Sequence, residues 1–484
     1  MADIDVEAMA ACPLQSVPLE VLLRITYWLN TTDLGSLRTT CKSIETMLFN
    51  SFAEEFFSRK QFMITDFSLQ ALIDMSKGRM GPRIRRLQFG LEQIKRDCSF
   101  HSSDHVVEMY ANQAALWNSG AQIDMLSEAL SNLENLQEVV IRDFDSQSRK
   151  RDNTVWHSYG YTSAIDAGAA FSMTRRGYAT IGAEIYDPAA RTFSSLLQAL
   201  GKAGQRPKGL ELLFRQGNNL SDASFAIPQF LQSTVVPVLQ KLETLHLCVA
   251  LGRGTMTGEV SQSAGAQYLC RFLSYTSNLK NLRINGLRTL NPGLDRLLTH
   301  LADPNLPVAG LGHGISLPNL TDLSLGMMEV DKSLLISVFK TLATSLKSLE
   351  FWRVMMVGTI DPEEYADDPK SVKPIWHNFC QELIQIPNLN IRHIMLGCLE
   401  DVNRAHRPFD RSRVVFGGNG ERLAYTGPDW KRFMQERLPT LKYEVPPDFN
   451  ANQQSNVDEA LDEDMGEGSA SEEDGSSSES EGSG

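Results

Sequence analysis

A short phrase of apolar residues recurs along most of this chain and constrains its fold more than any other feature. The phrase reads apolar-x-x-apolar-x-apolar and occurs between residues 84 and 443. Alternate side chains of a strand point to the same face, so the last two apolar positions would point inward from a short strand. The eight copies are Ile84/Leu87/Phe89, Leu136/Val139/Ile141, Leu242/Leu245/Leu247, Leu279/Leu282/Ile284, Leu320/Leu323/Leu325, Leu346/Leu349/Phe351, Ile391/Ile394/Leu396 and Leu438/Leu441/Tyr443.

Stretches with helical periodicity precede several copies, and this alternation predicts a parallel sheet backed by helices. The phrase is typical of the strands of leucine-rich repeats. Successive copies lie roughly 26 to 74 residues apart when a weaker candidate copy at Leu210/Leu213 is included, whereas regular repeats are about 20 to 29 residues long. The array is therefore expected to be irregular and to carry insertions. The helical stretches are residues 121–130, 193–203, 264–276, 331–344, 374–386 and 428–437.

Residues 17–45 predict two short helices with more apolar surface than so small a segment can bury by itself. Pro18 can open the first helix, because a first-turn position loses nothing by lacking an N–H group. Thr32 is a candidate N-cap for the second helix, with Asp33 against the positive end of its dipole. The apolar residues at helical spacing are Val21, Leu22, Ile25, Trp28 and Leu29, followed by Leu34, Leu37, Cys41 and Ile44.

This pattern resembles the F-box, the module that docks substrate receptors onto the Skp-type adaptor of cullin-RING ubiquitin ligases. Val17 stands where a Leu is usual, and Ile44 or Glu45 where a Trp often closes the motif. Residues 56–90 are similar to the segment that follows the F-box in many proteins of filamentous fungi. The residues that match the pattern are Pro18, Glu20, Leu22, Ile25, Leu29, Asp33, Leu34, Leu37, Arg38, Cys41 and Lys42.

The resemblance implies an α-helical F-box at 12–60, followed by a linking region at 61–83 with a helix near Ser68 to Lys77. The repeated phrase predicts an irregular α/β solenoid at 84–445. The resemblance also implies that a few side chains contact the Skp-type adaptor. An alternative from the residues alone is a helical hairpin packed on the rest of the chain, since apolar stripes usually face a core. The implied adaptor contacts are Pro18, Leu22, Ile25, Leu29, Leu34 and Leu37.

The function implied is that of a non-catalytic, substrate-recognition subunit of an SCF-type ubiquitin ligase, which binds cullin through the adaptor and an unknown protein substrate through the solenoid. The alternative is a protein-interaction scaffold that acts outside any ligase. No catalytic residue, metal site or cofactor is expected, because the chain lacks the common nucleophile, phosphate-loop and metal-ligand motifs. Gly417 to Gly420 predict a hairpin turn rather than a phosphate loop.

The net charge of -13 is concentrated at the C-terminus. From Asp458 onward there are eleven Asp and Glu and no Lys or Arg, which leaves -13 + 11 = -2 for the remainder. The Ser- and Gly-rich residues 446–484 are expected to be a disordered tail, because they offer little apolar surface to offset the entropy of ordering. The tail is either solubilising or a target of acidophilic kinases, and the candidate phosphorylation sites are Ser469, Ser471, Ser476 and Ser478.

The longest insertion, residues 145–192, is a candidate recognition loop, and a loop folded over the sheet is the alternative. The near-neutral body argues against binding to nucleic acid, and no apolar run is long enough to cross a membrane. Seven scattered cysteines without a C-x-x-C pair favour the cytoplasm or the nucleus. The aromatic and basic residues of the insertion are Trp156, Tyr159, Tyr161, Tyr178, Arg175 and Arg176.

Overall fold

The structure of the chain is a computed structural model. All described residues belong to one unit, which lies within residues 1–443. The predicted tail and its four candidate serines lie outside the described residues. The structure describes residues 13–95, 103–145, 151–153, 155–172, 187–251, 265–286, 292–358, 373–403, 410–417 and 420–443.

The chain begins with a short 3-10 helix, η1 (Pro13–Ser16), and three α-helices: α1 (Leu19–Tyr27), α2 (Thr31–Thr39) and α3 (Lys42–Phe57). Pro18 is the N-cap of α1, one position before the first turn in which the sequence predicts it. The prediction for the second helix was wrong by two residues, because its N-cap is Asn30 rather than Thr32. The Asn30 side chain accepts a hydrogen bond from the backbone N–H of Asp33 at 2.7 Å, and so satisfies one of the free N–H groups of the first turn.

A parallel sheet follows, in the order β1-β2-β4-β6-β8-β9-β10-β12-β14, and antiparallel β17 closes it. Seven of the eight predicted phrases and the weaker copy at Leu210 each run into one of its strands. The sheet starts at β1, earlier than the predicted solenoid boundary at residue 84. Its strands are β1 (Arg59–Phe62), β2 (Arg86–Gly90), β4 (Glu138–Arg142), β6 (Gly209–Leu213), β8 (Thr244–Ala250), β9 (Asn281–Asn285), β10 (Asp322–Gly326), β12 (Ser348–Trp352), β14 (His393–Gly397) and β17 (Arg422–Thr426), with β7 (Leu220–Ser221) beside β8.

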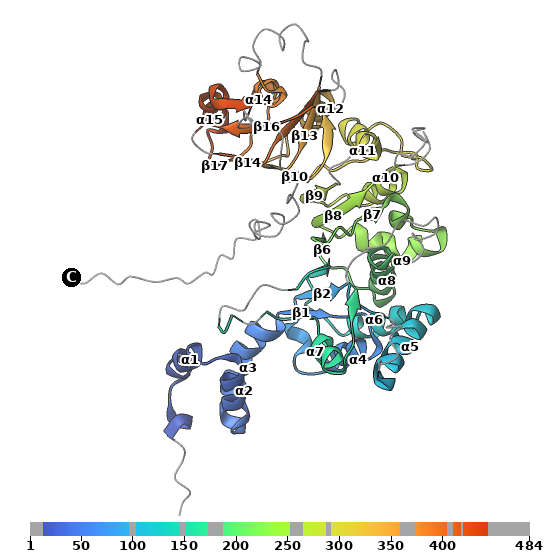
Figure 1. Cartoon of the computed structure of the whole chain (residues 1–484), viewed down its shortest axis with the longest axis vertical. Coiled ribbons are helices and arrows are strands. Elements are labelled where there is room, and N and C mark those ends of the chain that lie inside the picture. Colours follow the sequence, from blue (N-terminus) through green and yellow to red (C-terminus); the bar gives the residue numbers. More distant parts are fainter. Residues whose placement is uncertain are drawn as a thin grey trace, which may run out of the picture. The chain divides into compact units, whose positions relative to one another are not determined.

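Helices connect the strands, and most successive helices contact one another along the array (Figure 1). The six predicted helical stretches and the linking helix are present. After the linking helix, the described residues contain four further helices that were not predicted: α5, α7 (Tyr161–Asp166), α9 and α11. The helices are α4 (Asp66–Lys77), α5 (Asp104–Ser119), α6 (Ala121–Ser131), α8 (Pro188–Ala203), α9 (Gln229–Leu239), α10 (Gln267–Ser274), α11 (Pro292–Ala302), α12 (Lys332–Leu342), α14 (Ile375–Gln385) and α15 (Trp430–Arg437), with short 3-10 turns at η2 (Gly81–Arg83), η4 (Asp222–Phe225) and η5 (Leu438–Thr440).

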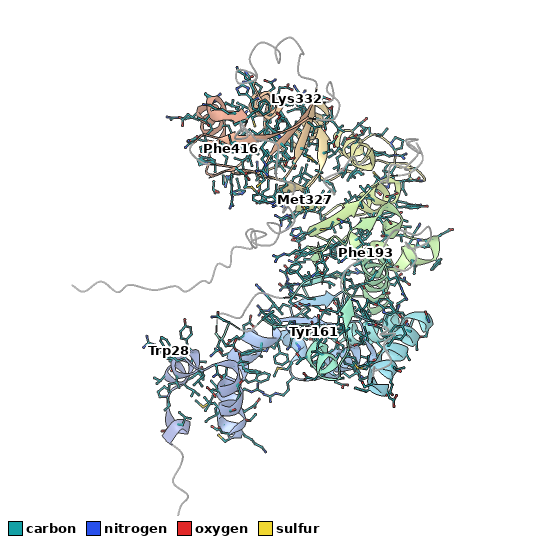
Figure 2. All side chains as sticks on the ribbon, in the orientation of Figure 1. Trp28, Tyr161, Phe193, Met327, Lys332 and Phe416 are labelled. Atoms are coloured by element: carbon teal, nitrogen blue, oxygen red, sulfur yellow. The ribbon has the colours of Figure 1, made fainter. Side chains whose placement is uncertain are left out.

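One continuous apolar core fills the space between the strands and the helices. The phrase explains it, because the inward apolar positions of neighbouring strands lie in register, as Leu323 does with Leu282 and Leu349. Aromatic rings fill the wider gaps: Phe193 lies 5.5 Å from Phe225 between ring centroids, and Figure 2 labels it within the helical layer. The strand phrase therefore specifies both the sheet and the core beneath it.

The chain turns sharply after each of the strands β10, β12 and β14, and each turn leads into a strand of a second sheet. The turning residues Met327, Arg353 and Cys398 have φ of 52°, 54° and 51°, a left-handed conformation that costs a non-glycine residue roughly 1 to 2 kcal/mol. Backbone hydrogen bonds fix the turns, such as Arg353 N–H to Gly397 O at 2.9 Å. The second sheet has the order β11 (Glu329–Asp331), β13 (Met355–Gly358), β15 (Glu400–Asn403), β16 (Asp410–Phe416) and β18 (Leu441–Tyr443).

Two details at the C-terminal end differ from the predictions. The eighth phrase forms β18, which pairs antiparallel with β16 in the second sheet and is not a repeat strand. The strands on either side of Gly417 to Gly420 do not form a paired hairpin, because β16 lies in the second sheet and β17 in the first. A turn is nevertheless present, since Phe416 N–H donates to Gly420 O at 2.8 Å. Local turn chemistry could not show that the chain changes sheets here.

The insertion packs over the start of the sheet within residues 155–172. It forms α7 (Tyr161–Asp166) and β5 (Phe171–Ser172), which pairs with β3 (Gln93–Ile94). Tyr159 N–H donates to Gln61 O at 2.8 Å. This part of the insertion therefore agrees with a loop folded over the sheet. Three residues of the candidate recognition surface, Arg175, Arg176 and Tyr178, lie outside the described residues.

Candidate functional site

The three N-terminal helices have an apolar core of their own, separate from the core of the sheet. Leu22 from α1 and Leu34 from α2 are 0% and 3% exposed. They pack with three buried residues of α3, and the half-buried Leu29 and Leu37 complete this cluster. The α3 residues are Ile44, Leu48 and Phe56. The two apolar stripes seen in the sequence thus pack largely on each other and on α3.

A second set of apolar side chains on the same helix faces solvent. Trp28 is 82% exposed, Val21 47% and Ile25 40%, and their spacing places them on one face of α1. Figure 2 shows Trp28 at the outer side of this helix. Leu19 and Tyr27 are also exposed, and the Tyr27 ring meets Trp28 edge to face at 5.4 Å. We call these residues the α1 patch: Leu19, Val21, Ile25, Tyr27 and Trp28.

The structure divides the six predicted adaptor-contact residues into three groups. Pro18 and Ile25 are exposed, Leu29 and Leu37 are half-buried, and Leu22 and Leu34 are buried. As a correction, Leu22 and Leu34 have no surface to offer a partner while the three-helix core is intact. The sequence could not separate the groups. Apolar residues lie on more than one side of α1, and the sequence does not show which side packs against α3.

Arg151 of the insertion connects this helical unit to the sheet. Its guanidinium forms a bidentate pair with Glu55 of α3, with both N–O distances at 2.7 Å. The same side chain donates to the carbonyl oxygens of Leu29, at 2.7 Å, and Thr26. These carbonyls lie at the C-terminal end of α1, where a cation is favourable. Glu55 is the main reason that the pKa of Arg151 lies above its usual range.

A second set of polar contacts joins α3 to the start of the sheet. Arg83 donates to the side chain of Asn50 at 2.7 Å, and Arg85 lies 3.2 Å from Glu54. The guanidinium of Arg79 stacks over Phe49, 4.0 Å from the ring centroid. Polar side chains with well-defined partners, rather than a shared apolar core, therefore hold the two parts together.

The face of the parallel sheet opposite the helices carries a network of charged side chains. Arg86 lies 2.9 Å from Glu138 and 2.7 Å from Glu211. Farther along, Glu350 accepts from Arg283 at 3.3 Å and lies 3.4 Å from His393. The sequence analysis did not identify these residues. They occupy positions written x in the phrase, next to the inward apolar residues, and the phrase places no requirement on these positions.

His246 lies in the middle of this network and is uncharged at neutral pH. Burial, assisted by the nearby Arg283, lowers its pKa to about 4. Its contact with Glu211 at 3.7 Å is therefore not an ion pair at neutral pH. The network is a polar face whose side chains are partly buried and pair with one another.

The described residues do not contain a group of three or more His, Cys, Asp or Glu side chains that could hold a metal ion. Within the same residues, no helix combines the length and the apolar character that crossing a bilayer requires. Among the described residues, the α1 patch and the polar face of the sheet are two candidate binding surfaces.

No family model matches the chain, and no curated protein matches it. Among solved structures it is similar to the leucine-rich repeat-containing protein LegL7 from Legionella pneumophila, with 12% identity, coverage of 71% of this chain and 91% of that one, and a TM-score of 0.26. It is also similar to a chain of the Rad7 and Elc1 complex in yeast, with 10% identity, coverage of 78% and 87%, and a TM-score of 0.24. At such TM-scores neither similarity carries an argument about this chain.

Proposed function

We propose that this protein is a non-catalytic substrate-recruiting subunit of an SCF-type ubiquitin ligase in the cytoplasm or nucleus. The observation that carries the proposal is the α1 patch, which presents Trp28, Ile25 and Val21 above a helical core that is already complete without them. A small domain rarely exposes so many large apolar side chains on one helix unless another protein covers them. The F-box-like pattern runs through the same helix and shares Ile25 with the patch, which supports the Skp-type adaptor as that partner.

The size of the patch is sufficient for docking. Complete burial of a large apolar side chain contributes roughly 1.5 to 3 kcal/mol. The five patch residues are 40% to 82% exposed, so burial of the surface that they still expose gives about 4 to 8 kcal/mol before the cost of association is subtracted. Exposed Pro18 lies at the start of the same helix and extends the contact surface. Trp28 is the expected anchor, because Trp is enriched among residues that dominate binding energy.

The solenoid serves as the substrate-binding part in this proposal. The polar face of its sheet gives a partner specific hydrogen-bonding and ionic contacts, as at Arg283 and Glu350. Contacts such as that of Arg151 with α1 hold the docking helix next to the sheet. A substrate bound there would be kept close to the ligase, which raises its effective concentration.

The test measures binding of the purified full chain to a purified Skp-type adaptor, with and without cullin. We expect Trp28→Asp/Ile25→Asp to weaken adaptor binding by more than tenfold. The matched control is Phe230→Asp on α9, which removes another apolar residue that is 78% exposed and should leave binding unchanged. If the wild-type chain does not bind the adaptor, the proposal is wrong. If it binds the adaptor but never assembles with cullin, the scaffold alternative is favoured.

A further inference from the structure

The residues at which the chain enters the strands of the parallel sheet are unusually rich in cations. The residues directly before and after the first apolar residue of each phrase form the entry edge. In the copy that leads into β6, Pro207 stands at this first position, since Lys208 N–H donates to Gln137 O at 2.7 Å. From β2 to β14, eight of these positions carry a cation and one carries the carboxylate of Glu243. The remaining seven carry amide or hydroxyl side chains. The cations are Arg83, Arg85, Arg206, Lys208, Lys241, Lys280, Lys347 and Arg392; the neutral residues are Asn135, Gln137, Asn278, Asn319, Thr321, Ser345 and Asn390.

Backbone hydrogen bonds hold the second residue of each pair in one line across the sheet. Lys280 N–H donates to Glu243 O at 2.8 Å, and Lys347 N–H donates to Thr321 O at 2.7 Å. The line continues with Arg392 N–H, which donates to Lys347 O at 2.6 Å. Since neighbouring strands lie about 4.8 Å apart, the seven strand steps from β2 to β14 span about 34 Å.

The carboxylates near this line do not neutralise it. Glu243 lies between two lysines, 2.9 Å from Lys280 and 3.6 Å from Lys208, and its hydrogen bond with Lys280 is the main cause of its lowered pKa. Glu54 of α3 pairs with Arg85. None of the ion pairs that the structure describes includes Lys347 or Arg392. The cations therefore outnumber the carboxylates that face them, in a chain whose net charge is -13.

A hollow of about 380 Å³ lies at the β2 end of the entry edge. Two of its lining residues are arginines and two are amides. Guanidinium and amide N–H groups are the donors that bind carboxylates most specifically. The hollow is thus the part of the entry edge where these donors surround a concavity, and this shape favours an anionic partner. Its lining residues are Pro82, Arg83, Arg85, Asn135 and Gln137.

We propose that the entry edge binds an extended, carboxylate-rich segment of a partner protein, with one acidic side chain in the hollow. An extended segment of about ten residues matches the 34 Å line. A single-stranded nucleic acid fits less well, because the entry edge has no aromatic residue on which bases could stack. If the proposed function holds, this partner is a substrate of the ligase. Binding of the acidic segment itself does not depend on that function.

The experiment uses the full chain without any adaptor, and a fluorescent twelve-residue peptide of alternating Glu and Ser. We expect the peptide to bind at low ionic strength, and its affinity to fall as salt screens the charges. Lys280→Glu/Lys347→Glu should weaken binding at least tenfold. Lys340→Glu/Arg432→Glu changes the net charge equally on helices α12 and α15 and should alter binding less than twofold. If the charge reversal disturbs folding, Lys280→Gln/Lys347→Gln should still weaken binding several-fold.

Three results would overturn the proposal. One is failure of the wild-type chain to bind the Glu peptide in preference to the same peptide with Gln in place of Glu. Another is an equal loss of binding in the α12/α15 control variant, which would indicate a non-specific effect of net charge. The third is tighter binding of a short single-stranded RNA than of the peptide. Because no adaptor is present, each of these outcomes is independent of whether the α1 patch docks the adaptor.

Discussion

The indole ring of Trp352 on β12 covers the place where a side chain of Gly397 on β14 would begin. The two residues are paired across neighbouring parallel strands. A β-carbon at Gly397 would lie 2.4 Å from both Cε3 and Cζ3 of the ring, much closer than van der Waals contact allows. The ring keeps this position on the sheet only because the neighbouring strand has no side chain there.

Gly397→Ala is therefore expected to displace the Trp352 ring and to lower the free energy of unfolding by about 1 to 3 kcal/mol. Chemical denaturation with tryptophan fluorescence as the readout measures both effects. The same change in a Trp352→Ala background should cost much less, because the clash is removed. A full additional loss in that background would show that the strand itself, and not the ring, excludes the β-carbon.

Leu22→Ala and Trp28→Ala should affect stability very differently, although both residues are apolar and lie on or next to α1. Leu22 is completely buried, and its truncation should destabilise the three-helix unit by about 2 to 5 kcal/mol. Trp28 is mostly exposed, and its truncation should change stability by less than about 0.5 kcal/mol. Hydrogen exchange of the α1 to α3 amides measures both. Similar protection in the two variants would contradict the assignment of core and surface.

Arg151→Ala should loosen α1 from the rest of the chain. The variant loses a bidentate ion pair with Glu55 and two hydrogen bonds to α1 carbonyls, so a local destabilisation of about 1 to 3 kcal/mol is expected. Faster amide exchange at the C-terminal end of α1 is the readout. Arg151→Lys should not restore protection, because an ammonium group cannot form the planar fork. Arg432→Ala, at an arginine that is 81% exposed, is the control.

Asp401 should make stability depend on pH. Its carboxylate accepts hydrogen bonds from Ile375 N–H at 2.6 Å and from the Tyr443 hydroxyl at 2.8 Å, but burial raises its pKa to about 7. The unfolded value is about 4, so the folded state holds the proton more tightly. The stability from this group is therefore fully present below about pH 4 and is lost as the pH rises through about 7.

The Asp401→Asn variant tests this dependence, because it keeps an acceptor without the charge. As the pH rises from 4 to 7, the unfolding free energy of the wild-type chain should fall relative to that of the variant. The slope of this fall should be at most about 1.4 kcal/mol per pH unit. Urea unfolding at several pH values measures the difference. Asp124→Asn, at a side chain that is 72% exposed, should run parallel to the wild type. A constant difference between wild type and Asp401→Asn would contradict the raised pKa.

The strands and most helices of this fold could be predicted because the phrase is local. The pattern around Leu323 or Leu349 combines an inward alternation with a preceding helical stretch, and both signals lie within about twenty residues. The helix α9 gave no such signal, since Pro237 lies inside it and Pro normally ends a helix. The change of sheet after Phe416 depends on which distant strand offers a free edge, and no local pattern contains that information.

The candidate sites could be predicted only in part. The pattern around Leu22 and Ile25 located the docking helix, but not which of its apolar stripes faces solvent, because that depends on how α3 packs against it. The pairing of Arg86 with Glu211 joins strands more than a hundred residues apart in the sequence. The entry edge becomes visible only after the register of the sheet is known.

The closing strands of the parallel sheet also bear on whether copies of this protein join end to end. One end is β1, where Arg59 is exposed. The other is antiparallel β17, where Arg422 and Thr426 are exposed. An incoming strand from a second molecule would have to desolvate a guanidinium at either end, which discourages such growth. Polymerisation into fibres, a hazard of sheets with exposed edge strands, is thus opposed by the residues of the first and last strands.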